Sequence, residues 1–330
     1  MKPVTRKVLS SNTRLAMPIL TFPGSRLIGA TVKQMVHDAA KQTAAQLLLR
    51  DRFHPAALLS AMDLSVEAEE FGATVRFSDT EVPTVIGRRV SDLLSANTLQ
   101  IPQVGSKRTR VYLDTIQNLS REKGDDLLLA GLIGPFSLAG RLYGVSELLL
   151  ATAAEPENVH GLLGKTTQYL KAYAGAFKDA GADGIIMAEP TAGLMSPQSV
   201  TEFSSPYVKE IIGAVENDSF QVILHNCGAR LRHLSAKLES GATTLHFGKP
   251  MDLPAGLLQV SRDIVLCGNL DPAGVFVHST PEGVASDTHS LLLATRSYRN
   301  FVISSGCDIP AEAPLENIKA FFDTVEAFHE

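Results

Sequence analysis

The sequence predicts an α/β protein that folds as a single (β/α)8 TIM barrel with an N-terminal elaboration. The first observation is that short apolar runs alternate with longer segments of helical periodicity. The second is that the runs are too short and too uniformly apolar for half-exposed hairpin strands, and are typical of buried parallel strands. The third is their number, eight, which a (β/α)8 barrel requires. A doubly wound open sheet is the alternative, although the chain has no P-loop and no glycine-rich dinucleotide fingerprint after an early strand.

The expected elements follow one another along the whole chain. The strands are expected at residues 15–20, 56–62, 127–133, 184–188, 221–224, 243–247, 264–267 and 301–304. Apolar residues at helical spacing predict a first helix over residues 31–49. The segment 65–125 does not fit one β/α unit, and residues 82–86 are expected to add a small hairpin there. Further helices are expected over residues 110–123, 156–180, 281–294 and 314–329. Gly181 follows the segment 156–180 and marks its C-terminal end. Pro281 and Pro314 mark the starts of the last two helices.

Composition excludes several classes of protein. The chain has 330 residues, of which 45% are apolar and 20% charged, so it can bury a large core and is not mainly disordered. Its net charge is −5 and it has no basic block, which argues against nucleic acid as a partner. Three cysteines cannot form a disulfide framework and indicate free thiols in a reducing compartment. No apolar stretch is typical of a signal peptide or a membrane span. We therefore expect a cytoplasmic protein in which residues 1–330 form one domain.

In such barrels the active site lies at the carboxyl ends of the strands. His225 and Cys227 occupy positions i and i+2 at the end of one expected strand, so their side chains face the same side. Cys307 follows the last strand and is expected to meet them across the barrel mouth. One nitrogen and two sulfurs suit Zn²⁺ with a fourth position open, and Glu189 is the nearest carboxylate by strand order. The alternative is that the cysteines are small buried hydrophobic residues.

Other strand-end residues have a functional and a structural interpretation. Asp63 is either a carboxylate that faces the cavity or a helix N-cap. Asn269 and Asp271 either orient a bound cofactor or form a turn before proline. Cys267 is expected to be a packed core thiol, and His246 has no partner visible in the sequence.

Six segments resemble the uroporphyrinogen decarboxylase superfamily, in particular its branch of zinc-dependent methylcorrinoid:coenzyme M methyltransferases. They are MDLSVEAEEFGA, GPFSLAGRLYG, AGADGIIMAEPTAG, VILHNCG, LCGNLDP and SSGCDIPAEAPLENIKAF. The resemblance covers the chain in order from about residue 15 and implies a single (β/α)8 barrel. The motif H-x-C with a distant cysteine matches His225, Cys227 and Cys307, which the resemblance implies as zinc ligands.

The resemblance implies a methyltransferase that moves a methyl group from a methylcorrinoid to a small thiol such as coenzyme M. The corrinoid is carried by a partner corrinoid protein, and zinc lowers the pKa of the thiol. Glu189 or water is expected to fill the fourth zinc position before the thiol binds. Residues 246–249 stand where relatives often carry an acidic pair, so the acceptor stays open. Barrels of this superfamily can dimerise, which makes a homodimer one expected assembly.

Two alternatives to this function remain. One is a decarboxylase of the uroporphyrinogen type with Asp63 as the central carboxylate. Those enzymes hold the carboxylates of their substrate with an arginine-rich N-terminal segment, whereas residues 18–27 contain Arg26 alone. Cys307 also replaces the histidine that the decarboxylases carry near their last strand. The other alternative is a barrel that binds a corrinoid or another ligand without catalysis.

Overall fold

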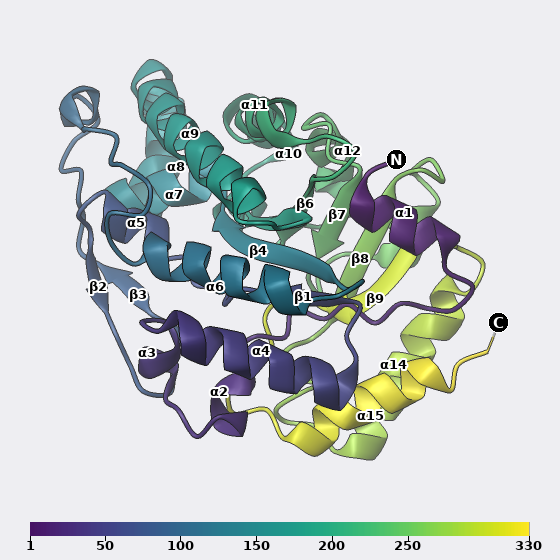
Figure 1. The fold of residues 1–330 in the computed structure, drawn as a ribbon. Helices are drawn as coiled ribbons and strands as arrows, with labels where there is room; N and C mark the ends of the chain where they lie inside the picture. The colour runs from purple at the N-terminus through teal and green to yellow at the C-terminus, as the bar shows by residue number, and fades with distance from the viewer. Residues whose placement is uncertain (330) are drawn as a thin grey trace.

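Seven parallel strands form one curled sheet in the computed structural model, which describes residues 1–329 except for the side chain of Asn97. The strand order is β1-β4-β5-β6-β7-β8-β9, and helices lie around the outside of the sheet (Figure 1). The strands are β1 (Ala57–Leu59), β4 (Leu127–Ile133), β5 (Gly184–Ala188), β6 (Gln221–Asn226), β7 (Thr244–Phe247), β8 (Val265–Leu270) and β9 (Phe301–Ser305). This is a TIM-barrel-like architecture, so the predicted fold class is confirmed.

The expected first strand, residues 15–20, is not a regular strand. Ala16 forms one isolated parallel bridge with Ile303 of β9, and its carbonyl oxygen accepts a hydrogen bond from the Ala56 backbone next to β1. The segment therefore contacts both edges of the seven-stranded sheet. Pro18, two residues after Ala16, has no N–H to donate, which prevents a continuous ladder at this position.

Most of the helices predicted from the sequence are present in the structure. The predicted helix over residues 31–49 is divided into α3 (Val32–Met35) and α4 (Ala39–Phe53), because the Asp38 carboxylate accepts hydrogen bonds from two backbone N–H groups and caps α4. A hairpin is present as the antiparallel pair β2 (Thr74–Arg76) and β3 (Thr84–Ile86), so the segment predicted to form it, residues 82–86, contains only its second strand. The other α-helices are α1 (Pro3–Ser10), α2 (Gly24–Leu27), α5 (Val66–Glu70), α6 (Thr109–Glu122), α7 (Pro135–Tyr143), α8 (Val145–Ala154), α9 (Pro156–Asp179), α10 (Pro197–Phe203), α11 (Ser205–Val215), α12 (Leu234–Leu238), α13 (Leu253–Leu257), α14 (Pro281–Thr295) and α15 (Leu315–Glu326). Short 3₁₀ turns occur at η1 (Ser95–Thr98), η2 (Thr191–Leu194) and η3 (Leu231–His233).

The N-terminal helix α1 covers the amino end of the strands. Gln221, the first residue of β6, accepts hydrogen bonds from the backbone N–H groups of Val4 and Thr5. This contact closes one end of the sheet with the predicted N-terminal elaboration and leaves the carboxyl end for the candidate site.

The interior of the curled sheet holds alternate residues of each strand. Ile223, Val265, Cys267 and Val302 are fully buried there and belong to one apolar cluster. Cys267 is therefore a packed thiol, as expected from the sequence, and burial raises its pKa. Because side chains alternate along a strand, residues two positions further on face the same interior at its carboxyl end.

None of the helices within residues 1–329 is both long enough and apolar enough to cross a lipid bilayer.

Candidate metal centre

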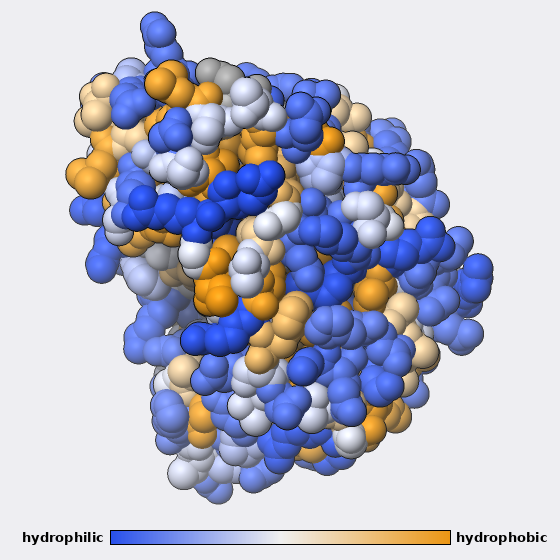
Figure 2. Space-filling view, turned by 90° about the vertical axis from the view of Figure 1, so that its left-hand side faces the viewer, coloured by the Kyte–Doolittle hydropathy of each residue, from blue (hydrophilic) through white to orange (hydrophobic). Residues whose placement is uncertain are grey.

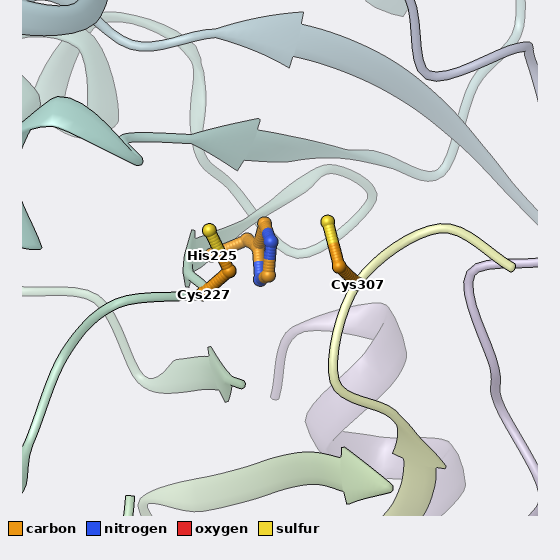
Figure 3. Close-up of side chains that lie close together, drawn as sticks. All are labelled: His225, Cys227 and Cys307. Carbon is orange, nitrogen blue, oxygen red and sulfur yellow. The ribbon is translucent and has the colours of Figure 1, made fainter. Parts of the chain in front are cut away.

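The structure brings together the three residues predicted as metal ligands. His225 is near the end of β6, Cys227 follows that strand directly, and Cys307 lies in the turn after β9. Their ligand atoms all lie within 4.8 Å of one another. Figure 3 shows the side chains converging at the strand ends, with the imidazole between the two thiols in that view. This is the one His, Cys, Asp or Glu group with metal-binding spacing found within the described residues.

The imidazole of His225 has one engaged and one free nitrogen. Its Nδ1 atom lies 2.8 Å from Nδ1 of His246. Its Nε2 atom is buried and has no hydrogen-bond partner among residues 1–329. A buried polar atom without a partner is unfavourable unless something else binds it. A metal ion bound by this nitrogen and the two sulfurs would satisfy it, so the residues fit zinc.

The two thiols are coupled by their proximity. The hydrogen bond from the Cys307 thiol, together with the nearby His225, lowers the pKa of Cys227 to about 4 in spite of partial burial. The same contact raises the pKa of Cys307. Thiolate is the form of cysteine that ligates metal, and the lowered pKa favours this form at Cys227.

Glycines allow the loops that carry the cysteines to pack backbone against backbone. A Cβ atom on Gly248, directly after β7, would lie 2.2 Å from the carbonyl oxygen of Cys227. A Cβ atom on Gly306 would lie 3.1 Å from the Cα atom of Gly248. The turns after β6, β7 and β9 therefore approach one another so closely that a side chain is excluded at Gly248, and one at Gly306 would require the neighbouring backbone to shift.

The turn that holds Cys307 is fixed by the N-terminal segment. The carboxylate of Asp308 accepts hydrogen bonds from the backbone N–H of Thr21, at 3.2 Å, and from its hydroxyl. The Ser305 hydroxyl accepts a hydrogen bond from the Ile19 backbone at 3.0 Å. The segment 15–21 thus supports one of the two cysteines, even though it is not a regular strand.

His246 is a site residue whose role the sequence did not reveal. It is fully buried and pairs with His225 in the register of β6 and β7. Its Nε2 atom lies 2.8 Å from the hydroxyl of Ser304 on β9. The two histidines lie next to each other only when the two predicted strands are aligned in the correct register. The sequence does not reveal that register.

Glu189, predicted as the fourth ligand, points to helix α7. Its carboxylate accepts hydrogen bonds from the backbone N–H of Phe136 at 2.9 Å and of Ser137 at 3.0 Å, and from the Ser137 hydroxyl at 2.7 Å. It is fully buried and is not part of the metal-binding group. Burial raises its pKa, and the charge of the buried Lys237 opposes that effect. The geometry therefore assigns Glu189 to the N-terminus of α7, where a negative charge is favourable.

Asp63 lies in a buried network rather than at an open cavity. One carboxylate oxygen accepts hydrogen bonds from the backbone N–H and the hydroxyl of Ser65. The other forms an ion pair with Arg108 at 2.6 Å and accepts a hydrogen bond from the Tyr112 hydroxyl at 3.1 Å. The side chain of Asp63 is 0% exposed. Both oxygens are therefore engaged by the protein itself.

Asn269 and Asp271, predicted to bind a cofactor, make contacts within their own region. The amide of Asn269 donates hydrogen bonds to the carbonyl oxygens of Gly248 and Met251. Asp271 pairs with Lys249 at 2.8 Å and accepts hydrogen bonds from the next turn of backbone. Asn269 thereby holds the glycine that packs against Cys227, which links it to the metal centre indirectly.

Comparisons with known proteins agree with this architecture. The family model described as uroporphyrinogen decarboxylase (URO-D) matches residues 9–328. The methylcobamide:CoM methyltransferase MtbA of Methanosarcina acetivorans is 28% identical over 270 residues, which cover 81% of this chain and 78% of that protein. The uroporphyrinogen decarboxylase of Methylobacillus flagellatus is 27% identical over 301 residues, covering 88% and 83%. A solved methyltransferase from Methanosarcina mazei superimposes with a TM-score of 0.88 at 20% identity, covering 98% of this chain and 97% of that one.

Proposed function

The chain belongs to the uroporphyrinogen decarboxylase family, and on that basis we propose that it is a zinc-dependent enzyme that moves a methyl group from a methylated corrinoid to a thiol. The observation that carries the proposal is the convergence of His225, Cys227 and Cys307 within 4.8 Å at the carboxyl ends of the strands. The MtbA relatives from two Methanosarcina species, at 28% and 27% identity, support methyl transfer from a corrinoid donor.

The three residues supply what a catalytic zinc ion needs. A set of three protein ligands leaves one position of a tetrahedral ion for a substrate. A zinc ion that binds a thiol in its open position would lower the pKa of that thiol, so that the thiolate is available near neutral pH. Cys227 and Cys307 would contribute negative charge, and Nε2 of His225, which has no hydrogen-bond partner within residues 1–329, would contribute a lone pair. The hydrogen bond between Nδ1 of His225 and His246 keeps the imidazole in place.

The methyl transfer balances without a further reactant. A bond forms between the sulfur of the acceptor thiolate and the methyl carbon, and the bond between cobalt and that carbon breaks. The electron pair of the broken bond stays on the cobalt. The products are a thioether, a Co(I) corrinoid and the proton that the thiol releases to solvent when it becomes a thiolate.

A corrinoid held by a partner protein must approach the carboxyl ends of the strands. Figure 2 shows the left-hand side of Figure 1, toward which β4 points. Apolar residues gather among hydrophilic ones on this face. Leu150 of α8 and Leu194 of η2, in segments that follow the ends of β4 and β5, are 74% and 66% exposed. Exposed apolar side chains of this kind are compatible with the corrinoid protein as partner. The acceptor is proposed to be a small thiol of the coenzyme M type.

Decarboxylation of a porphyrinogen fits the site less well. Asp63, the carboxylate that this reaction would use, is already engaged by Arg108 and Tyr112. Arg26 donates hydrogen bonds to the carbonyl oxygens of Glu312 and Ala313. A substrate with many carboxylates would need several free cations, and these contacts do not supply them.

Metal analysis of the purified protein tests the proposal. We expect about one zinc ion per chain, lost in Cys307→Ala, because a tetrahedral site with two remaining protein ligands binds weakly. Cys267→Ala is the matched control, since this buried thiol lies in the barrel interior outside the metal-binding group. An unchanged zinc content in Cys307→Ala would overturn the assigned site.

Catalysis is tested separately with methylcobalamin and coenzyme M. Formation of methylated coenzyme M by the wild-type protein, but not by Cys307→Ala, supports a methyltransferase. Zinc binding without methyl transfer to any thiol in a panel would instead indicate a ligand-binding barrel. Because the seven strands form one sheet, we propose that residues 1–330 act as a single domain in these assays.

A further inference from the structure

A row of three buried polar side chains extends behind the metal centre. His225 of β6 lies 2.8 Å from His246 of β7, measured between their Nδ1 atoms. The Nε2 atom of His246 lies 2.8 Å from the hydroxyl oxygen of Ser304 on β9. His246 and Ser304 are both 0% exposed, so bulk solvent does not reach them.

The hydrogen bonds in this row have one consistent direction. The Ser304 hydroxyl donates its single hydrogen to the carbonyl oxygen of Ser305 at 3.0 Å, so it accepts a hydrogen from Nε2 of His246. Nδ1 of His246 therefore carries a lone pair. It accepts a hydrogen bond from the Nδ1–H group of His225. This leaves the Nε2 atom of His225 without hydrogen, and it is the buried atom that has no partner among residues 1–329.

The row is supported by the sheet itself. His225 and His246 are register partners on neighbouring strands. Ser304 is two residues after Val302, which lies in the interior cluster. All three side chains therefore occupy the interior at the carboxyl end of the barrel. The backbone ladder fixes the spacing of β6 and β7, and the complete burial of His246 restricts rotation of its imidazole.

We infer that His246, held by Ser304, is a positioning residue that fixes the ring orientation and the hydrogen placement of His225 so that its Nε2 lone pair faces Cys227 and Cys307. This inference rests on the proposed function and deepens it. A ligand histidine whose second nitrogen is held by hydrogen bonding keeps its orientation, and loss of such a partner typically lowers metal affinity by about 10- to 100-fold. Here the partner is another imidazole rather than a carboxylate or a backbone carbonyl.

The test measures zinc affinity by competition with a chromophoric chelator. In His246→Phe the aromatic shape stays but the acceptor is lost, and we expect zinc affinity to fall by about 10- to 100-fold. In His246→Asn the side-chain oxygen stands close to the former Nδ1 position, and we expect most of the affinity to return. Ser304→Ala is expected to weaken binding, and Ser304→Thr, which keeps the hydroxyl, to preserve it. Cys267→Ala, at the register partner of His246 on β8, is the control for a disturbed interior.

A second readout reports the geometry of the centre directly. Co²⁺ bound in place of zinc has a visible absorption spectrum that depends on the orientation of its ligands. We expect this spectrum to change in His246→Phe and to resemble wild type in His246→Asn and Cys267→Ala.

The outcomes separate this inference from the proposed function. If the wild-type protein binds zinc, Cys307→Ala loses it, and His246→Phe binds with wild-type affinity and spectrum, the inference is wrong and the metal site stands. If Cys307→Ala keeps its zinc, the proposed function fails instead. Should His246→Phe not fold, the comparison of Ser304→Ala with Ser304→Thr decides, and equal affinity in these two variants overturns the inference.

Discussion

Replacement of Glu189 by alanine distinguishes a carboxylate that caps helix α7 from one that binds the metal. In the structure its two oxygens accept three hydrogen bonds, from the backbone of Phe136 and from the backbone and hydroxyl of Ser137. The alanine variant leaves these donors buried without an acceptor. It also removes the negative charge that opposes the effect of burial on Lys237, whose pKa burial lowers to about 8.

The loss of stability follows from these contacts. A buried donor that loses its partner costs about 1–3 kcal/mol, and the two backbone N–H groups cannot turn toward other acceptors. We therefore expect Glu189→Ala to lower the free energy of unfolding by about 4 kcal/mol. Globular proteins unfold with an entropy of about 2.1 cal/mol/K per residue, so for 330 residues the melting temperature should fall by about 6 °C.

Thermal unfolding and zinc analysis of the same samples provide the assay. Asp252→Ala is the matched control, because that exposed carboxylate caps α13 through one hydrogen bond to the Ala255 backbone at 3.0 Å. Its loss should cost about 1 kcal/mol, or about 1–2 °C. Glu189→Ala should be less stable than this control but should keep its zinc. A wild-type melting temperature in Glu189→Ala, with or without loss of zinc, would show that Glu189 does not stabilise the N-terminus of α7 as its contacts indicate.

Three further predictions address the surroundings of the site. Gly248→Ala should lower both zinc affinity and melting temperature, because the new Cβ atom would lie 2.2 Å from the carbonyl oxygen of Cys227; Gly213→Ala, where the Cβ meets no atom within 4 Å, should do neither. Asp63→Asn should lower the free energy of unfolding by about 1–3 kcal/mol in urea titrations, since the buried Arg108 loses one of its two carboxylate partners and keeps Glu69 at 2.5 Å, and wild-type stability would contradict the buried pair. Burial raises the pKa of Glu67 to about 8, so the stability from its protonated form is complete below pH 4.5 and is lost as the pH rises to 8. Glu67→Gln should flatten the dependence of unfolding free energy on pH in that range, and an unchanged slope would show that Glu67 does not titrate there.

Much of the fold could be predicted because buried parallel strands consist of short runs of apolar residues, which are visible in the sequence. Seven of the eight expected strands are present in the sheet. The exception, residues 15–20, is apolar and extended but contains Pro18, which interrupts the hydrogen-bond ladder. The helix expected at residues 31–49 is divided because Asp38 caps a new helix inside it. Apolar periodicity predicted burial in both cases, whereas backbone hydrogen bonding set the elements.

The candidate metal centre was partly predictable for a similar reason. His225 and Cys227 are two residues apart at a strand end, and a barrel brings the end of its last strand, with Cys307, to the same mouth. Glu189 and Asp63 also follow strands, but each carboxylate turns to partners from other segments. Position along the chain identified which residues reach the carboxyl end of the barrel, without indicating which of them remain free to bind a ligand.

The sequence by itself determined the class of fold, the end of the barrel that carries the polar residues and the three residues with metal-binding chemistry. The tertiary structure alone decided that Glu189 caps α7, that Asp63 pairs with Arg108 and that His246 connects His225 to Ser304. The physical reason is that strand periodicity depends on local sequence, whereas the partner of a buried polar group comes from a segment 21 to 58 residues away in these examples. Only the packed sheet brings such segments within hydrogen-bond distance.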